Sequence, residues 1–488
     1  MSQKQPTSEL KFFSRKSIPV EMHKPKVVQQ LNLVPIERRL KALEESGYNT
    51  FLMETKDVFL DMLTDSGTNA MSDCQTASMF MADEAYAGSA SFSRLKEAIY
   101  EVMGKKFVLP VHQGRAAENI LCTKYVKEGM MVPMNYHFTT TMAHIRHKGG
   151  DIAELFTKEA TKIKSDFPFK GNIDCDLLRD FIKRTGVDKV PFIRMECSTN
   201  LLGGQPFSMA NLREVRKIAD SFGIMVVMDA SLIGENVFMV KQREAEFRDV
   251  SVADIMKEMC ALAHIVYFSA RKVSSSRGGA ICTNDPEVFE GMKELVPLFE
   301  GFLTYGGIPL RDIESMATGL RESVNIDVVS SSPSFIEYMA KELDNAGVPV
   351  ILPGGALGCH IDAMSFLSHL PQQHYPAGSL AAAYFLVSGV RGMERGTISS
   401  VRDENGNDVL SDMELLRLAL PRRVFSLSHI EYAIDRLVWL HKNRELVGGI
   451  RFTHEPKIMR FFTGRLEAIG DWPQKLMAKF RHDFGNSL

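Results

Sequence analysis

The feature that most constrains the fold of this 488-residue chain is an alternation of apolar and amphipathic segments between about residues 100 and 290. Between two of the apolar segments, Ser208 is placed as an N-cap and Gly223 as the C-terminal glycine of a helix. Strands buried on both faces and joined by such helices predict a mostly parallel sheet with helices on each side. The strands are expected at 106–110, 191–196, 224–228 and 264–269.

Two of these strands deliver reactive groups to one edge of the expected sheet. Asp229 follows the segment at 224–228, and Lys272 lies three residues after Ser269. Ligands of parallel sheets gather at the carboxyl ends of the strands. Taken singly, Asp229 fits a turn cap and Lys272 a surface lysine. Together they are what pyridoxal phosphate (PLP) requires, a lysine that forms an imine and an acid that keeps the ring nitrogen protonated.

Other residues that follow strands extend the predicted cofactor site. Gln113, Gly114 and Arg115 open a helix, and N-terminal N–H groups beside a guanidinium suit a phosphate. Phe138 offers a ring to stack on the pyridine, and Asn200 a donor for the phenolic oxygen. A core position for Phe138 and a turn for Asn200 are the structural alternatives.

The composition excludes several partners. A formal net charge of -2 gives no sign of a nucleic acid or an anionic membrane as partner. No apolar run approaches the roughly 18 residues that span a bilayer, and the N-terminal residues lack the apolar stretch of a signal peptide. Seven dispersed cysteines without C-x-x-C spacing favour reduced thiols and a cytoplasmic protein.

Other catalytic motifs fit less well. Ser269 and Lys272 match the S-x-x-K spacing of acyl-transferring serine enzymes, but that motif belongs at a helix start and here it follows a strand. The histidines form no H-E-x-x-H or other metal-binding grouping, and the sequence contains no Walker motif and no G-x-G-x-x-G.

Six longer stretches are specific enough to indicate a family: 47–51, 63–73, 83–88, 112–115, 203–206 and 460–463. On these stretches the chain resembles the β-eliminating lyases, the family of tyrosine phenol-lyase and tryptophanase, from about residue 35 to 465. The resemblance implies an α/β, fold-type I (aspartate aminotransferase-like) PLP enzyme. Its expected parts are an N-terminal arm with part of the small domain (1–64), a large PLP-binding domain with a mostly parallel sheet (65–325), and a smaller α+β domain (326–488).

Carried over residue by residue, the resemblance implies a cofactor site and a substrate site. Lys272 would be the Schiff-base lysine and the base at the substrate Cα, and Tyr86 the acid that protonates the leaving group. Arg417 would clamp the substrate carboxylate. The cofactor would be held by Gln113, Gly114, Arg115, Phe138, Asn200, Asp229, Ser269 and Lys272. The substrate would be held by Phe51, Thr64, Thr139, Arg395, Arg417, Phe461 and Phe462.

The resemblance is closest to tyrosine phenol-lyase. Arg395 and Thr139 follow its pattern, whereas tryptophanases carry an aliphatic residue at the first position. This implies a carbon–carbon lyase that converts a tyrosine-like amino acid to a phenol-type product, pyruvate and ammonia. Two alternatives stay open. One is β-elimination, β-replacement or other Cα chemistry on tryptophan, cysteine or a substituted tyrosine. The other is a catalytically weakened PLP-binding protein with a regulatory or pathway-partner role.

The chain also departs from the family at three positions. Leu232 stands where the family has an arginine that contacts the cofactor's phenolic oxygen, and Arg271 stands where it has a lysine. Arg277 lies in the segment that helps to build the family's potassium site, with Glu84 and the Gly67 backbone. We therefore expect the Arg277 guanidinium to lie near Glu84 and to substitute for potassium. The family assembles as homotetramers, so a dimer of dimers is implied.

Overall fold

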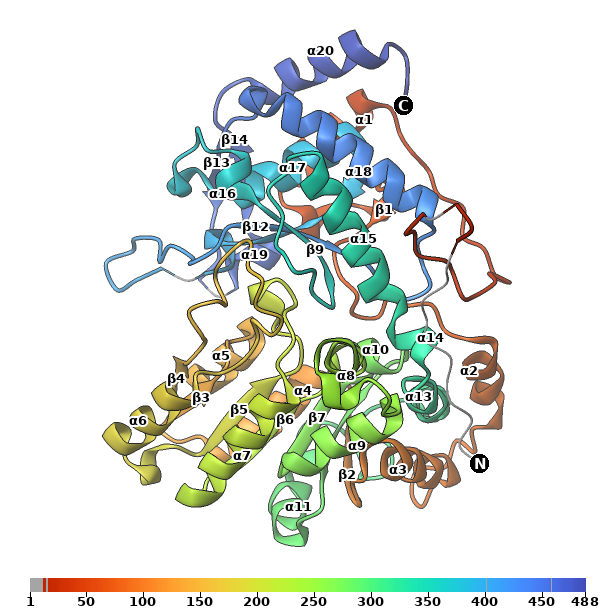
Figure 1. The fold of residues 1–488 in the computed structure, drawn as a ribbon, viewed down its shortest axis with the longest axis vertical. Coiled ribbons are helices and arrows are strands. Elements are labelled where there is room, and N and C mark those ends of the chain that lie inside the picture. Colours follow the sequence, from red (N-terminus) through yellow and green to blue (C-terminus); the bar gives the residue numbers. More distant parts are fainter. Residues whose placement is uncertain (1–11, 15, 401, 458) are drawn as a thin grey trace. The chain divides into compact units, whose positions relative to one another are not determined.

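The structure is a computed structural model that describes residues 12–14, 16–400, 402–457 and 459–488 (Figure 1). The chain forms two compact units. Unit 1 comprises 66–160 and 167–333 with the described residues before 18, and unit 2 comprises 18–65, 161–166 and 334–488. Part of the expected N-terminal arm, residues 1–11 and 15, lies outside the described residues.

A seven-stranded sheet forms the centre of unit 1, in the order β2-β8-β7-β6-β5-β3-β4. Its strands are β2 (Phe107–Val111), β3 (Met131–Met134), β4 (Asp151–Glu154), β5 (Phe192–Glu196), β6 (Met225–Asp229), β7 (Ile265–Ser269) and β8 (Gly279–Thr283). From β4 to β7 neighbouring strands are parallel, whereas β8 runs antiparallel to both β7 and β2. The predicted mostly parallel sheet is confirmed.

Helices cover both faces of this sheet. Helix α4 (Gly114–Tyr125) packs its apolar side chains with Val227 and Tyr267 in one buried cluster. Helices α7 (Met209–Phe222) and α9 (Val252–Leu262) lie in front of the strands in Figure 1. The predicted caps of α7 are confirmed, because the Ser208 hydroxyl accepts from the Asn211 N–H at 3.0 Å and Gly223 has φ 68°.

Further helices complete unit 1. They are α2 (Asp73–Ser78), α3 (Ala90–Met103), α5 (Thr139–His147), α6 (Cys175–Thr185), α8 (Ile233–Arg243), α10 (Ala270–Val273), α11 (Pro286–Lys293), α12 (Leu295–Phe299), α13 (Leu310–Glu322) and α14 (Ile326–Val329). Helix α15 (Ser331–Asn345) begins in unit 1 and continues into unit 2.

Unit 2 mixes small sheets with helices. Its three-stranded antiparallel sheet has the order β11-β12-β9, with β9 (Gly358–Asp362), β11 (Met393–Arg395) and β12 (Leu415–Ala419). Two further pairs are β1 (Leu60–Asp61) with β10 (Val390–Arg391), and β13 (Ile450–His454) with β14 (Arg465–Ala468). Its other helices are α1 (Ile36–Glu45), α16 (Ala363–Phe366), α17 (Pro376–Ser388), α18 (Leu427–Lys442), α19 (Arg460–Thr463) and α20 (Trp472–Phe484).

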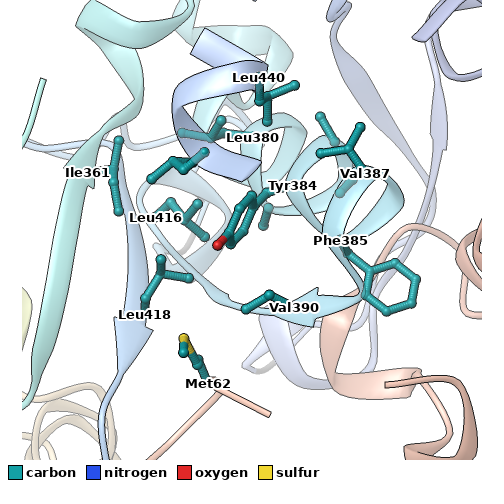
Figure 2. Close-up of a cluster of buried hydrophobic side chains, with 14 of the residues drawn as sticks. Met62, Ile361, Leu380, Tyr384, Phe385, Val387, Val390, Leu416, Leu418 and Leu440 are labelled. Carbon is teal, nitrogen blue, oxygen red and sulfur yellow. The ribbon is translucent and has the colours of Figure 1, made fainter. Parts of the chain in front are cut away.

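The core of unit 2 surrounds helix α17, which is buried on every side. Figure 2 shows Tyr384 and Phe385 of this helix among apolar side chains of β9, β12 and α18. The Tyr384 hydroxyl donates to the Ala433 carbonyl at 2.8 Å, so that its polar atom is satisfied inside the core.

Residues 348–352 form only isolated bridges, at Val350 and Leu352. Pro349 lies within this segment and Pro353 follows it, and neither provides a backbone N–H for a longer ladder. Among the described residues, no helix is both long enough and apolar enough to cross a bilayer.

Candidate active site

Lys272 and Phe138 face each other in unit 1. Lys272 lies in the short helix α10, directly after β7, and its Nζ is 5.5 Å from the centre of the Phe138 ring. Phe138 is the residue before α5, where the chain is still extended. Both side chains are half-buried. The amine therefore lies over the ring at a cation–π distance.

Asp229 ends strand β6 and is held from two sides. Its Oδ2 accepts from the Arg194 guanidinium at 2.8 Å, and its Oδ1 accepts from the Ser231 N–H at 3.0 Å. The side chain of Asp229 is buried. The carboxylate is therefore fixed in orientation, and each oxygen keeps a lone pair for a further donor.

The start of α4 meets the end of β7 at close range. A Cβ on Gly114 would lie 3.0 Å from the Ser269 Cβ, so any other residue would have to push Ser269 away by a few tenths of an ångström. Gln113 is the N-cap residue of the helix and Arg115 is exposed on its first turn. The Ser269 N–H donates to the Ser231 hydroxyl at 3.0 Å. N-terminal N–H groups, a hydroxyl and a guanidinium thus gather where an anion is favoured.

Two further predicted residues lie near this group. The backbone N–H of Asn200 donates to Glu196 at 3.1 Å. The Thr139 hydroxyl, next to Phe138, is buried and has no hydrogen-bond partner among the described residues. A buried hydroxyl without a partner indicates a space that a polar ligand completes. An amine, a carboxylate, an aromatic ring and an anion-binding helix start are together the donor set that PLP requires, so these residues fit the cofactor.

Arg194 and Glu196 are parts of this arrangement that the sequence reasoning missed. They lie two residues apart in the fully buried strand β5 and form an ion pair at 2.9 Å. Two charges at that spacing point to the same face of a strand. The neighbouring strand segments are apolar, so two charged residues within one such strand were a visible exception in the sequence. This exception is the signal that could have identified the pair.

In unit 2, Arg417 and Arg395 lie on one face of the small sheet. Arg417 in β12 is opposite Met393 in β11, and Arg395 is two residues further along. Arg417 is 1% exposed and donates to the Leu63 carbonyl at 2.8 Å. Burial lowers the pKa of Arg417 to about 10 against the opposing effect of Asp65, so the guanidinium stays charged at neutral pH.

An aromatic cluster lies elsewhere in unit 2. The Phe51 ring meets the rings of Phe461 and Phe462 edge-on, at centroid distances of 5.7 and 5.0 Å. Asn49 holds α19 in place by donating to the Phe461 carbonyl at 3.1 Å. Thr64 is half-buried. Phe51 and Phe461 line a small pocket with Tyr48, Asn49, Thr50, Gly378, Ala381, Glu394, Ile398 and Leu466.

Glu394 makes this pocket sensitive to pH. Its Oε2 accepts from the Ser399 hydroxyl at 2.8 Å, whereas its Oε1 is buried and has no hydrogen-bond partner among the described residues. Burial, and then the nearby Glu414, raises the pKa of Glu394 to about 7. The folded state therefore binds this proton more tightly than the unfolded chain does.

We expect the stability contributed by the Glu394 proton to be complete below pH 4.5 and to be lost as the pH rises through about 7. The loss is about 3 kcal/mol, because each unit of pKa is worth about 1.4 kcal/mol. Thermal unfolding of the full chain measures this effect. Glu394→Gln should flatten the fall in midpoint between pH 5 and 8, whereas the surface control Glu467→Gln should fall in parallel with the original chain. An unchanged slope in Glu394→Gln contradicts the assignment.

The predicted general acid, Tyr86, and Glu84 of the predicted cation site lie two residues apart at the surface of unit 1. Tyr86 is 69% exposed, and its ring stacks on Phe302 at 5.5 Å. A hydrogen bond with Tyr305 raises the pKa of Tyr86. The expected proximity of Arg277 to Glu84 stays a prediction. Arg277 donates to the Gly67 carbonyl at 3.3 Å as expected, but Glu84 pairs with Arg311 at 2.9 Å because α13 brings that guanidinium to it.

The remaining departures are also placed in unit 1. Leu232 is buried and precedes α8. The Arg271 carbonyl accepts from the Gly67 N–H at 3.0 Å, and a Cβ on Gly67 would meet the guanidinium groups of Arg271 and Arg277. Burial lowers the pKa of Arg271, and the charges of Arg277 and Arg115 lower it further. The structure thus gathers the predicted cofactor residues in unit 1. The predicted substrate residues Arg395, Arg417, Phe51, Phe461 and Phe462 lie in unit 2.

Comparison with known sequences gives one consistent family. The family model described as "Beta-eliminating lyase" matches residues 61–436. The tyrosine phenol-lyase of Pasteurella multocida is 42% identical over 454 residues, which cover 93% of this chain and 99% of that protein. The tyrosine phenol-lyase of Symbiobacterium sp. is 41% identical and covers 92% of this chain and 98% of that protein.

Solved structures show the fold. A serine palmitoyltransferase of Sphingomonas wittichii has a TM-score of 0.58 at 13% identity, over 84% of this chain and 97% of that one. An aromatic aminotransferase of Pyrococcus horikoshii has a TM-score of 0.56 at 13% identity, over 84% of this chain and 99% of that one. The predicted fold-type I architecture is confirmed.

Proposed function

This chain belongs to the β-eliminating lyases and is a PLP-dependent lyase, and we propose that it cleaves L-tyrosine to phenol, pyruvate and ammonia. The observation that carries the proposal is the nearly full-length identity of about 40% to several tyrosine phenol-lyases. Arg395 and the buried, unpartnered Thr139 hydroxyl support the tyrosine-like substrate, because both are polar groups suited to a phenol oxygen.

PLP, when bound, supplies an electron sink for the electron pair left at the substrate Cα. Lys272 is proposed to hold the cofactor covalently between turnovers and then to take the Cα proton on its Nζ. The contact of Nζ with the Phe138 ring supports this role, since the ring orients the amine toward the proposed cofactor space. Asp229 is proposed to hold the ring nitrogen, and Asn200 the phenolic oxygen.

The phosphate is proposed to lie at the start of α4. Gln113, Gly114 and Arg115 offer N–H groups and a guanidinium, and Ser269 a hydroxyl. The close contact between Gly114 and Ser269 supports this assignment, because it brings donors of two elements to one point.

In unit 2, Arg417 is proposed to bind the substrate carboxylate, with Thr64 beside it. Its burial supports the role, because a desolvated guanidinium binds a carboxylate strongly. Phe51, Phe461 and Phe462 are proposed as the apolar wall for the aromatic ring. Tyr86 is proposed to protonate the leaving group, and its raised pKa keeps that proton available at neutral pH.

We propose that the position of the family's potassium ion is taken by guanidinium groups. The contact of Arg277 with the Gly67 carbonyl and the pairing of Glu84 with Arg311 support this, since both oxygens already face a positive charge. Activity should then change less than about twofold when sodium replaces potassium. A steep rise with potassium contradicts the proposal.

We propose that the protein forms a homotetramer, because unit 1 exposes several large apolar side chains. Patches of such side chains are typical of interfaces. Sedimentation of the full chain tests it, and a monomer overturns it. The side chains are Met71, Phe80, Met81, Tyr86, Leu298 and Phe299. A cytoplasmic location is proposed as well, because the seven cysteines are all free.

Pyruvate release from a panel of amino acids tests the proposed reaction. L-tyrosine should be the best substrate when compared with L-tryptophan, L-cysteine, L-serine and substituted tyrosines. A faster reaction with another member would assign that substrate instead. No pyruvate from any of them, with a normal cofactor spectrum, would favour the second candidate, a catalytically weakened PLP-binding protein. The specific observation behind that candidate is the buried Leu232 at the position of the family's arginine.

A further inference from the structure

Four polar side chains share one face of the central sheet in unit 1. Arg194 and Glu196 lie two residues apart in β5 and therefore point to the same side. Glu196 is opposite Asp229 in the parallel β6, and Asp229 is opposite Tyr267 in β7. Helix α4 covers this face and brings Glu118, whose carboxylate accepts from Thr140 at 2.6 Å and from Thr141.

The Arg194–Glu196 pair connects two proposed cofactor contacts. Arg194 donates through Nη2 to Asp229 at 2.8 Å and through Nη1 to Glu196 at 2.9 Å. The other oxygen of Glu196 accepts from the Asn200 N–H at 3.1 Å. A single buried chain of hydrogen bonds thus runs from Asn200 through Glu196 and Arg194 to Asp229.

On this face one guanidinium is paired with two carboxylates. Burial opposes the charge of Arg194, but Tyr267, Glu196, Asp229 and Glu118 raise its pKa well above the usual value. Burial raises the pKa of Glu118, and that of Tyr267 well above its usual range, which favours their neutral forms. Burial keeps the thiols of Cys197 and Cys122 neutral in the same way. The ion pairs on this face therefore join one guanidinium, Arg194, to the carboxylates of Glu196 and Asp229.

We propose that Arg194 and Glu196 are positioning residues that orient Asp229 and Asn200 and that together set the proton affinity of the cofactor's ring nitrogen. The inference rests on the proposed function, in which Asp229 holds that nitrogen. Arg194 alone would cancel the charge of Asp229 and weaken its hold on a proton. Glu196 restores the negative unit, so the pair fixes the geometry without removing the charge.

Charge-neutral and charge-changing variants separate these effects. Glu196→Gln keeps the shape and the acceptor for Asn200 but removes one negative charge. The double variant Arg194→Met with Glu196→Gln removes both charges and restores the net value. Glu314→Gln is the matched control, because Glu314 is also buried and also paired with an arginine, Arg94, elsewhere in unit 1.

The measurement is the ¹⁵N chemical shift of PLP labelled at its ring nitrogen, bound to the full-length protein and followed against pH. We expect Glu196→Gln to lower the midpoint of ring-nitrogen deprotonation by about one pH unit or more. The double variant should return most of the way to the original midpoint. Glu314→Gln should leave it unchanged.

Other results overturn the inference. An unchanged midpoint in Glu196→Gln, or a double variant that shifts at least as far as the single one, means that the pair acts only on folding. Absence of any bound-cofactor signal in the original protein is a different result, because it overturns the proposed function itself.

Discussion

Lys272→Ala is expected to lower kcat for pyruvate release from L-tyrosine by about 10⁴-fold, the largest effect of any single substitution. The change removes both the amine that holds the cofactor and the proposed base at Cα. Lys272 lies at the end of a buried strand with its Nζ 5.5 Å from the Phe138 ring, so no change of fold is needed to explain the loss. Steady-state kinetics with purified protein measures the effect.

A second measurement makes the Lys272 result specific. Borohydride should fix the cofactor to the original protein and add its mass to the chain, but not to Lys272→Ala. The neighbouring Arg271→Lys is the control and should still be labelled. Retained activity together with retained labelling in Lys272→Ala would show that another amine carries the reaction.

Arg417→Gln is expected to lower kcat/KM by roughly 10²- to 10³-fold, mostly through KM. A buried guanidinium that binds a carboxylate contributes on that scale, and glutamine offers no charge to replace it. Thermal stability should change little, because burial already lowers the pKa of Arg417 to about 10 and so opposes its charge in the folded state.

Arg391→Gln is the matched control for Arg417. Arg391 is also buried in unit 2, and its Nε donates to Asp61 at 2.9 Å. Its loss should lower the unfolding midpoint, because Asp61 loses its partner, while KM stays within about twofold. An Arg417→Gln variant with the original KM for L-tyrosine would remove Arg417 from the substrate site.

The central sheet was predictable because a continuous run of apolar residues is enough to identify each of its buried strands. Segments such as 224–228 and 265–268 are almost entirely apolar, and burial on both faces makes that pattern favourable. Asp229 and Ser269 end these strands, so their place at the sheet edge followed from strand length alone. The caps of α7 followed in the same way, from the local chemistry of Ser208 and Gly223.

Contacts between distant segments were not predictable from local pattern. The pairing of Glu84 with Arg311 depends on where α13 packs, and nothing near either residue in the sequence encodes that position. Arg194 and Glu196 were overlooked because strand residues with charge ordinarily face solvent. Only the register of β5 against β6 shows that both are enclosed beside Asp229.

The antiparallel strand β8 has a consequence for the reactive lysine. Parallel neighbours need a long crossover, but β7 returns directly into β8 through residues 270–278. The Ala270 N–H bonds the Gly278 carbonyl at 2.9 Å and closes this return at its base. Lys272 therefore lies in a short connection that is joined to the sheet at both ends. Its backbone entropy is lost during folding, so the amine approaches each substrate from a position that is already set.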